Sequence, residues 1–428
     1  MKYIVLLGDG MSDYKIPELG GRTPLQAAKK PNMDFIAQNG VTGLARTIPD
    51  GVSKGSDTAN MSVMGFDPRE YYTGRSPIEA VSMGIELGED DIAYRCNLVN
   101  LSGGEPYEDK TMVDYSSDEI SSEEAAGLVA AINEGLPEDL AGDCAAGGIR
   151  FYPGISYRHC MVWKGRGLGT ACTPPHDILT RRIGDYLPVD ADGGCDARIL
   201  ERLMRKSYSR LVSHGINLER ERRGLHPANS LWLWGQGKRL SLPSFYGKYG
   251  MKGAVVAAVD LIKGIGISAG MRSVDVEGAT GTLDTNYEGK AKAALSALDD
   301  GCDFVYIHVE APDECGHRYE IENKVKSIEY IDERLLSAVL DGVRRRNWDF
   351  SIMVIPDHAT PLSLRTHTVD PVPFAIYSTR AGVAGGAGAF FSSNGAKSLA
   401  YDEDEALKSG IIVDPGYTLM DIFLKPRH

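Results

Sequence analysis

The sequence has few cysteines, and none of them has the spacing of a metal-binding or redox motif. Its 428 residues contain seven cysteines and no CxxC pair. An odd number of cysteines without paired spacing argues against a disulfide framework. We therefore expect reduced, mostly buried thiols in a cytoplasmic protein. The seven are Cys96, Cys144, Cys160, Cys172, Cys195, Cys302 and Cys315.

Long apolar runs and an excess of positive charge are also lacking. No apolar stretch reaches the ~18–20 residues that a membrane span needs, and the first residues lack the apolar core and cleavage site of a signal peptide. The formal net charge is −13, which argues against a general binder of nucleic acid or anionic membranes. We expect no nucleic-acid or membrane partner, whereas a homo-oligomer stays open.

Strand and helix patterns alternate at both ends of the chain. Apolar strand candidates lie at residues 3–8, 230–234, 254–258, 304–309, 351–355 and 374–377, and helical patterns at 31–39, 56–64, 288–298, 320–346 and 417–424. This alternation predicts an α/β fold with a doubly wound, mainly parallel sheet. Between about residues 80 and 228 the strands are shorter and the loops longer. We predict a discontinuous domain of residues 1–79 and 229–428, with a smaller α/β domain of residues 80–228 inserted.

Asp and His residues recur where the predicted strands end. Asp9 follows the first strand, Asp313 and His317 follow residues 304–309, and Asp357-His358 closes residues 351–355. His367 precedes the apolar run 372–377. Ligands of open α/β sheets bind outside the carboxyl ends of the strands, so these side chains can share one rim. Three carboxylates and three imidazoles are the ligand chemistry of a two-metal hydrolytic or phosphoryl-transfer site. Taken alone, each motif favours an ordinary structural role, such as an Asp helix cap with a surface histidine, so the prediction depends on the convergence of all of them.

Ser56 is the candidate nucleophile. It opens the helical pattern after Lys54-Gly55, and a serine hydroxyl needs a base or a metal to become reactive. A helix N-terminus also favours a phosphate there. The alternative is that Ser56 is an ordinary helix cap.

Several basic residues could bind an anionic substrate. Their sequence context does not separate them from solvated surface charges. They are Arg75, Arg95 and Lys263, together with Arg158-His159 and His176-Asp177 in the inserted region.

These motifs together resemble the archaeal-type cofactor-independent phosphoglycerate mutases of the alkaline phosphatase superfamily. The resemblance covers nearly the whole chain. It is carried by Gly8-Asp9-Gly10, residues 18–25, Gly55-Ser56-Asp57-Thr58-Ala59-Asn60, residues 72–75, residues 278–281, Asp313 with His317, Pro356-Asp357-His358, and His367 with residues 370–373.

The resemblance implies an alkaline-phosphatase-like domain interrupted by a smaller α/β domain. It implies two divalent metal ions (Mn, Mg, Zn or Co) and no 2,3-bisphosphoglycerate. One ion would be bound by Asp9, Ser56, Asp357 and His358, and the other by Asp313, His317 and His367. By similarity, Lys263 and the arginines of the inserted domain bind phosphate or carboxylate. The longer bacterial mutases carry Asn-Ser-Glu-Val-Gly-His where this chain has residues 55–60, and their inserted domain is longer.

The expected activity is interconversion of 3-phosphoglycerate and 2-phosphoglycerate through a phosphoserine on Ser56, with the inserted domain closing over the small phosphorylated substrate. A general base would come from the inserted domain, with His159 and His176 as candidates. The alternative is a homoserine kinase-like phosphotransferase of the same family. Met11, residues 157–159 and residues 308–312 resemble that branch.

Overall fold

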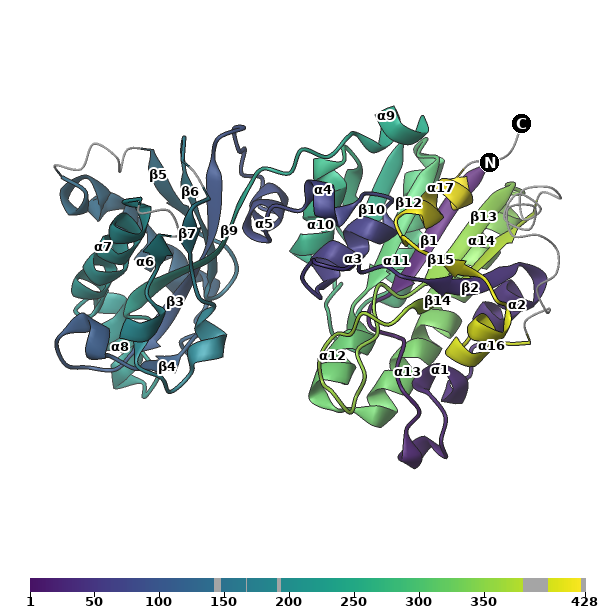
Figure 1. The fold of residues 1–428 in the computed structure, drawn as a ribbon, viewed down its shortest axis with the longest axis horizontal. Coiled ribbons are helices and arrows are strands. Elements are labelled where there is room, and N and C mark those ends of the chain that lie inside the picture. The colour runs from purple at the N-terminus through teal and green to yellow at the C-terminus, as the bar shows by residue number, and fades with distance from the viewer. Residues whose placement is uncertain (142–147, 167, 191–193, 380–398, 425–428) are drawn as a thin grey trace. The chain divides into compact units, whose positions relative to one another are not determined.

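The computed structural model of the protein describes residues 1–428 except 142–147, 167, 191–193, 380–398 and 425–428. The described residues form two compact units (Figure 1). The first unit contains residues 1–72 and 241–428, and the second contains residues 73–240.

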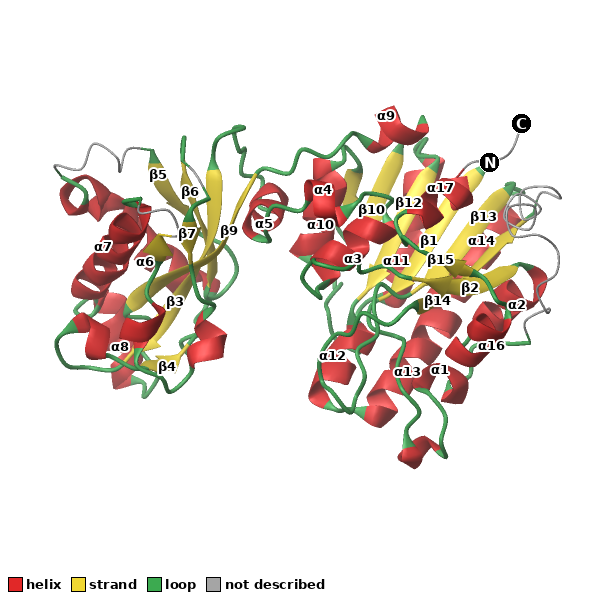
Figure 2. Ribbon diagram, in the orientation of Figure 1, coloured by secondary structure: helices red, strands yellow, loops and turns green. Residues whose placement is uncertain are grey.

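The first unit is built on an eight-stranded sheet (Figure 2) with the order β11-β10-β12-β1-β13-β14-β2-β15. Seven strands run in the same direction, and β14 alone is antiparallel to its neighbours. This confirms the predicted mainly parallel sheet. The strands are β1 (Lys2–Gly8), β2 (Val41–Ala45), β10 (Gly253–Val256), β11 (Arg272–Val274), β12 (Phe304–Val309), β13 (Phe350–Ile355), β14 (Val372–Ser378) and β15 (Ile412–Val413).

Helices cover both faces of this sheet, because its central strands are apolar on both sides. Ile4 and Leu6 of β1 point into a core with the helices α2, α11 and α14. Tyr3 points to the opposite face and contacts Phe423 of α17. Buried, nearly continuous apolar strands are typical of a parallel sheet covered on both faces. The longer helices are α2 (Pro31–Asn39), α3 (Ser56–Val63), α10 (Asp260–Ser268), α11 (Tyr287–Asp299), α12 (Ala311–Arg318), α13 (Ile321–Tyr330), α14 (Ser337–Arg345) and α17 (Thr418–Leu424).

Shorter helical segments complete the first unit. The predicted helix over residues 320–346 is observed as α13, a π-helical turn at Ile331–Leu336, and α14. The remaining segments are η1 (Pro17–Leu19), α1 (Pro24–Ala27), α4 (Pro68–Tyr71), α9 (Phe245–Tyr249) and α16 (Glu403–Lys408).

The second unit is built on a five-stranded antiparallel sheet in which β9 pairs with β3. Its strands are β3 (Ile92–Leu101), β4 (Met112–Asp114), β5 (Ile149–Tyr152), β6 (Arg158–Trp163) and β9 (Ser230–Lys238), and a separate pair consists of β7 (Thr170–Ala171) and β8 (Val189–Asp190). Its helical segments are α5 (Ser76–Ser82), η2 (Tyr107–Asp109), α6 (Ser122–Asp139), η4 (Pro175–Ile178), η5 (Ile183–Tyr186), α7 (Asp196–Leu211) and α8 (Gly215–Arg222).

Alternation along β3 gives the two faces of this second sheet different environments. Tyr94 and Cys96 lie in a core with α6 and α7. Ala93 packs with Cys160 and with Ala80 of α5 on the other face, which is also the face to which Arg95 belongs.

Strand β9 shows where the sequence prediction was wrong. The sequence pattern predicts that residues 230–234 belong to the parallel sheet, but β9 pairs with β3 in the second unit. The compact units divide at residues 72/73 and 240/241, whereas the sequence placed the boundaries at 79/80 and 228/229. The difference arises because an apolar strand pattern does not specify which sheet the strand joins.

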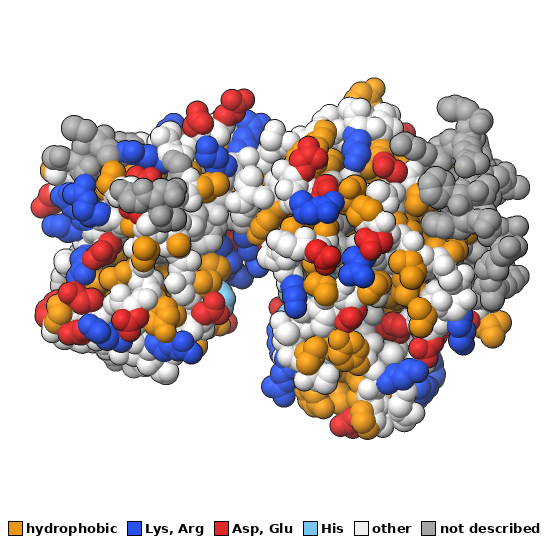
Figure 3. All heavy atoms as spheres, in the orientation of Figure 1, with side chains coloured by type: hydrophobic (Ala, Val, Ile, Leu, Met, Phe, Trp, Pro, Cys, Tyr) orange, Lys and Arg blue, Asp and Glu red, His pale blue; other side chains and the backbone are white. Residues whose placement is uncertain are grey.

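The described cysteines are mostly buried, as expected. Cys96, Cys160, Cys302 and Cys315 are buried, Cys172 is intermediate and Cys195 is exposed, while Cys144 lies outside the described residues. None of the described helices is both long and apolar enough to cross a membrane. On the face shown in Figure 3, basic and acidic side chains are interspersed.

Candidate active site and metal centre

The predicted Asp and His residues lie together at the carboxyl ends of the central strands of the first unit. Asp9 follows β1, Asp357 and His358 follow β13, and α12 carries Asp313 and His317 just after β12. The segment between β13 and β14 supplies His367. Ser56 is the first residue of α3, and its Oγ lies 3.1 Å from Nε2 of His358.

The first group of ligand atoms surrounds Nε2 of His358. Oδ1 of Asp9 lies 3.5 Å from this nitrogen, and Oδ2 of Asp357 lies 3.4 Å from it. With the Ser56 hydroxyl, two carboxylates, one imidazole and one hydroxyl converge on one point. Asp9 and His358 are fully buried, with exposed fractions of 1% and 0%.

The second group is centred on Asp313. Its Oδ2 lies 3.2 Å from Nε2 of His317, and its Oδ1 lies 3.4 Å from Nε2 of His367. The two Nε2 atoms are 2.9 Å apart. The His367 ring also stacks on the His358 ring with 3.9 Å between centroids, so the two groups are neighbours.

The other nitrogen of each imidazole in the second group faces a backbone carbonyl. Nδ1 of His317 lies 2.9 Å from the oxygen of Arg365, and Nδ1 of His367 lies 2.9 Å from the oxygen of Lys54. A carbonyl only accepts hydrogen bonds, so each Nδ1 carries a proton, and each Nε2 presents a lone pair when its imidazole is neutral. Two lone pairs and a carboxylate that converge in this way are suited to a cation, and the carbonyl contacts are the outer support that ligating histidines commonly have.

The shifted pKa values of the site residues indicate that a positive charge would stabilise the buried carboxylates. Burial, together with the charges of Asp357, Asp313 and Glu310, raises the pKa of Asp9 well above its ordinary value. Oδ1 of Asp9 is buried and accepts no hydrogen bond from the described residues. A hydrogen bond to Asp313 raises the pKa of His317 to about 9. Burial alone would raise the pKa of Asp313, but the hydrogen bonds of His317 and His367 hold it well below its ordinary value. The donor set and its uncompensated charge fit divalent cations.

Several residues that support this site were not predicted. Nε2 of His308 lies 3.0 Å from Oδ2 of Asp9, and His308, Asp9 and Asp357 form a compact ligand group. Asn60 donates to Oδ2 of Asp357 (2.7 Å) and accepts from the hydroxyl of Tyr306 (2.7 Å). The hydroxyl of Thr360 donates to Oδ1 of Asp313. The usable signal was that His308 is a polar residue inside the otherwise apolar strand β12.

Gly10 permits the close approach of the strand ends. Its φ is +62°, and a Cβ at this position would lie 2.6 Å from Oγ1 of Thr360 and 2.8 Å from Oδ1 of Asp313. Its amide donates to Oδ1 of Asp357 (3.2 Å). Glycine adopts this left-handed conformation without a steric penalty.

Lys263, predicted to bind phosphate, lies on α10 of the first unit. Its ammonium forms a 2.6 Å ion pair with Oδ1 of Asp275. A phosphate bound by Lys263 would compete with this partner, and the role of Lys263 stays a prediction.

The predicted substrate-binding arginines gather in the second unit around a glutamate. Glu79 of α5 contacts Nε of Arg75 at 2.8 Å and Nε of Arg95 at 3.1 Å. Burial would raise the pKa of Glu79, but the charges of Arg95, Arg75 and Arg158 outweigh it and lower that pKa. The guanidinium of Arg95 also lies over the ring of Trp234, 4.3 Å from its centroid.

The two candidate bases differ in their surroundings. His159 is buried, its Nδ1 accepts the amide of Gly154 (3.0 Å), and burial lowers its pKa to about 4. Its position on β6 turns it away from the arginine-bearing face, because adjacent strand residues point to opposite faces. His176 packs edge-on against Trp234, with 5.2 Å between centroids. Its Nε2 lies 3.7 Å from Oδ1 of Asp177.

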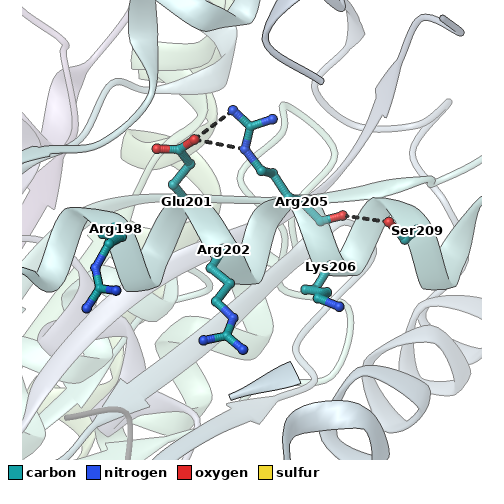
Figure 4. A pocket seen from close by; sticks show the side chains of 6 residues that line it. All are labelled: Arg198, Glu201, Arg202, Arg205, Lys206 and Ser209. Atoms are coloured by element: carbon teal, nitrogen blue, oxygen red, sulfur yellow. Dashed lines mark hydrogen bonds and ion pairs between the residues drawn. The ribbon is translucent and has the colours of Figure 1, made fainter. Parts of the chain in front are cut away.

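A separate surface hollow of about 360 Å³ lies along α7 (Figure 4). All of its lining residues come from this one helix, and Glu201 pairs with Arg205 (2.7 Å). The lining is Arg198, Glu201, Arg202, Arg205, Lys206 and Ser209. The hollow contains none of the predicted site residues.

Comparison with known proteins identifies the family. The family model for 2,3-bisphosphoglycerate-independent phosphoglycerate mutase matches residues 37–217. A protein of that name from Methanothrix thermoacetophila is 50% identical over 88% of this chain and 90% of its own length. Another from Methanosarcina barkeri is 46% identical over 100% of both chains.

Two solved structures match nearly the full length of the chain. The cofactor-independent phosphoglycerate mutase from Thermoplasma acidophilum is 27% identical, covers 99% of both chains and has a TM-score of 0.64. A protein of Pyrococcus horikoshii is 29% identical, covers 100% of this chain and 98% of its own, and has a TM-score of 0.77. This chain therefore belongs to the family of 2,3-bisphosphoglycerate-independent phosphoglycerate mutases.

Proposed function

We propose that this protein interconverts 3-phosphoglycerate and 2-phosphoglycerate through a phosphoserine on Ser56, at a site that holds two divalent metal ions. The observation that supports this proposal most directly is the position of Ser56. Its hydroxyl lies at the start of a helix and 3.1 Å from Nε2 of His358, beside the buried carboxylates. The names of the relatives favour the mutase over the homoserine phosphotransferase. The cytoplasmic location and a homo-oligomer stay predictions from the sequence.

Seven side chains are suited to hold the metal ions. In the proposed arrangement Asp9, Ser56, Asp357 and His358 bind one ion, and Asp313, His317 and His367 bind the other. His308 and Asn60 orient Asp9 and Asp357 from outside this set. Bound divalent ions would lower the pKa of the Ser56 hydroxyl and offset the charge of a transferring phosphoryl group.

In the proposed transfer, Ser56 carries the phosphoryl group from one hydroxyl of glycerate to the other. Oγ of Ser56 attacks phosphorus in line, so the Oγ–P bond forms as the bond between phosphorus and the C3 oxygen breaks. The C3 oxygen takes up a proton, which balances the proton that Ser56 gave up. The C2 hydroxyl of the retained glycerate then attacks phosphoserine and returns Ser56 to its starting state. The amide groups at the start of α3 favour the phosphate on Ser56.

Retention of glycerate is what separates a mutase from a phosphatase, because water would otherwise hydrolyse the phosphoserine. We propose that Arg75, Arg95 and Arg158 bind anionic groups of the three-carbon substrate, because arginine matches carboxylate and phosphate in a two-pronged geometry. His176 is the better candidate for proton transfer, since it lies beside the Arg95–Trp234 pair. The buried His159 is disfavoured.

The test is a coupled assay of the purified full chain loaded with Mn²⁺, with 3-phosphoglycerate and without 2,3-bisphosphoglycerate. We expect 2-phosphoglycerate to form, and we expect EDTA to abolish its formation and Mn²⁺ to restore it. Free phosphate in place of 2-phosphoglycerate would indicate a phosphatase. Phosphorylation of homoserine with ATP, without mutase activity, would favour the alternative.

A further inference from the structure

One carboxylate joins two arginines on the face of the second unit that α5 covers. Oε1 of Glu79 lies 2.8 Å from Nε of Arg75, and Oε2 lies 3.1 Å from Nε of Arg95. Each carboxylate oxygen therefore holds a different arginine. Glu79 is itself mostly buried, with 20% of its side chain exposed.

Arg95 is held rigidly in this arrangement. Only 11% of its side chain is exposed, and the Trp234 ring lies against its guanidinium. The indole N–H of Trp234 donates to Oδ1 of Asn97 (2.9 Å), which fixes the ring. Among the described residues, neither Nη atom of Arg95 has a hydrogen-bond partner. Neither Nη atom belongs to the buried unpartnered atoms of the described residues, so both reach solvent and can donate to an anion.

The contacts of Glu79 leave the anion-binding edge of Arg95 open. A guanidinium has one edge formed by its two Nη atoms and another that includes Nε. Glu79 occupies the Nε position. The four groups Glu79, Arg75, Arg95 and Arg158 still carry a net charge of +2 when ionised, so an oxyanion remains attracted.

We propose that Glu79 is a positioning residue, which orients Arg75 and Arg95 so that they bind an oxyanion of the three-carbon substrate. The inference rests on the proposed function for the identity of that substrate. The shared chemistry is a planar carboxylate or a phosphate, because both match the edge of a guanidinium.

Glu79→Gln separates this role from simple charge neutralisation. If Glu79 only neutralised charge, its removal would add one positive charge to the cluster and tighten anion binding. If Glu79 orients the arginines, the same substitution weakens anion binding, because the two guanidinium groups repel each other and lose their shared anchor. The two roles therefore predict changes of opposite sign.

The experiment measures 3-phosphoglycerate binding by calorimetry to the Mn²⁺-loaded, full-length Ser56→Ala protein, with and without Glu79→Gln. We expect Glu79→Gln to weaken binding by about tenfold or more, and Glu79→Asp to recover part of the loss. In the enzyme with Ser56 intact, KM should rise more than kcat falls. Inorganic phosphate and glycerate, as separate probes, show which group of the substrate the arginines bind. If Glu79→Gln weakens the binding of phosphate, the arginines bind the phosphate group; if it weakens the binding of glycerate, they bind the carboxylate.

Glu86→Gln is the matched control, because Glu86 is exposed and lies in the same unit. This substitution changes the charge by the same amount as Glu79→Gln. It should leave binding unchanged. The effect of Glu79→Gln should also shrink in an Arg95→Lys background, since the residue acts through Arg95. Tighter or unchanged binding in Glu79→Gln would overturn the inference. A wild-type chain without mutase activity would contradict the proposed function instead, while the binding comparison would still test Glu79.

Discussion

The Nε2 atoms of His317 and His367 face each other at 2.9 Å, while the Nδ1 atom of each ring lies against a backbone carbonyl. Two nitrogens in this arrangement cannot both remain neutral acceptors without a positively charged group between or on them. In the metal-free protein that group is a proton, and in the proposed metal-bound protein it is a divalent ion.

Metal binding should therefore release protons. A histidine with a pKa of about 9 is protonated at pH 7.5, and it must lose its proton to bind a metal. Calorimetry of Mn²⁺ binding in two buffers of different ionisation enthalpy should show release of up to about one proton from His317. The release should diminish above pH 9. Proton release that is the same in His317→Ala would contradict this assignment.

The metal-free protein should lose stability as the pH rises. The raised pKa of His317 stabilises the folded state fully below about pH 6.5, and this contribution is lost as the pH passes through about 9. Thermal melting in EDTA should show a Tm that falls between these values, with a smaller fall in His317→Ala. A Tm in EDTA that is constant over this range would be the contrary result.

Asp9→Asn should stabilise the metal-free protein and weaken metal binding. The pKa of Asp9 is raised by burial and by neighbouring carboxylates, so its ionised form disfavours the folded state above its ordinary pKa. The free energy of unfolding in EDTA at pH 8 should therefore be higher in Asp9→Asn than in wild type. With saturating Mn²⁺ the wild type should become the more stable of the two proteins, because metal binding adds more to its free energy of unfolding. Urea titrations under both conditions provide the measurement.

Ser56→Ala should abolish mutase activity without unfolding the protein. Removal of the nucleophile should lower kcat by a factor of about 10³ or more, while the bound Mn²⁺ is retained by the remaining ligands. Ser62→Ala is the control, because Ser62 lies in the same helix and its buried hydroxyl has no hydrogen-bond partner among the described residues. Comparable activity in the two variants would exclude Ser56 as the nucleophile.

Gly10→Ala should damage both stability and the site. Its positive φ costs about 1–2 kcal/mol for a non-glycine residue, and the new Cβ would overlap Thr360 and Asp313. Gly20→Ala shares the positive φ of +69° but has open space around the new atom, so it should show only the conformational cost. Urea titration and the Mn²⁺ content of the two variants separate the two effects.

The strand ends could be predicted from the sequence because parallel strands deliver their carboxyl ends to one edge. Asp9, Asp313 and Asp357 each follow a long apolar run, and this pattern can be recognised without knowing which strands pair with one another. His308 was missed because it lies within β12, where only its contact with Asp9 distinguishes it from a buried core histidine. Asn60 was missed as a supporting residue for a similar reason, since a polar residue on a helix is usually solvated.

The second unit was harder to predict because its chemistry depends on pairing between antiparallel strands. Arg95, Trp234 and Arg158 become neighbours only through the register of β3 with β9 and β6. The same register decides which residues of β3 lie beside Arg158, whereas alternation along β6 alone places His159 on the opposite face from Arg158. A single sequence gives the alternation along each strand, but it does not give the partner strand or the register.

The pairing of β1 also determines the order in which the protein is able to fold during synthesis. Tyr3 pairs with Phe304 and with Ser351, so the partner strands of β1 are synthesised about 300 residues after β1 itself. At about 5–20 residues per second, that interval is on the order of 15–60 s. The second unit has its own core and closer pairings, such as Arg95 with Cys160 and Trp234, so it completes its contacts first. A nascent chain therefore carries a folded second unit while β1 is still an unpaired apolar strand. The same holds for β2, whose partners β14 and β15 are synthesised later still, and both unpaired strands need protection from aggregation.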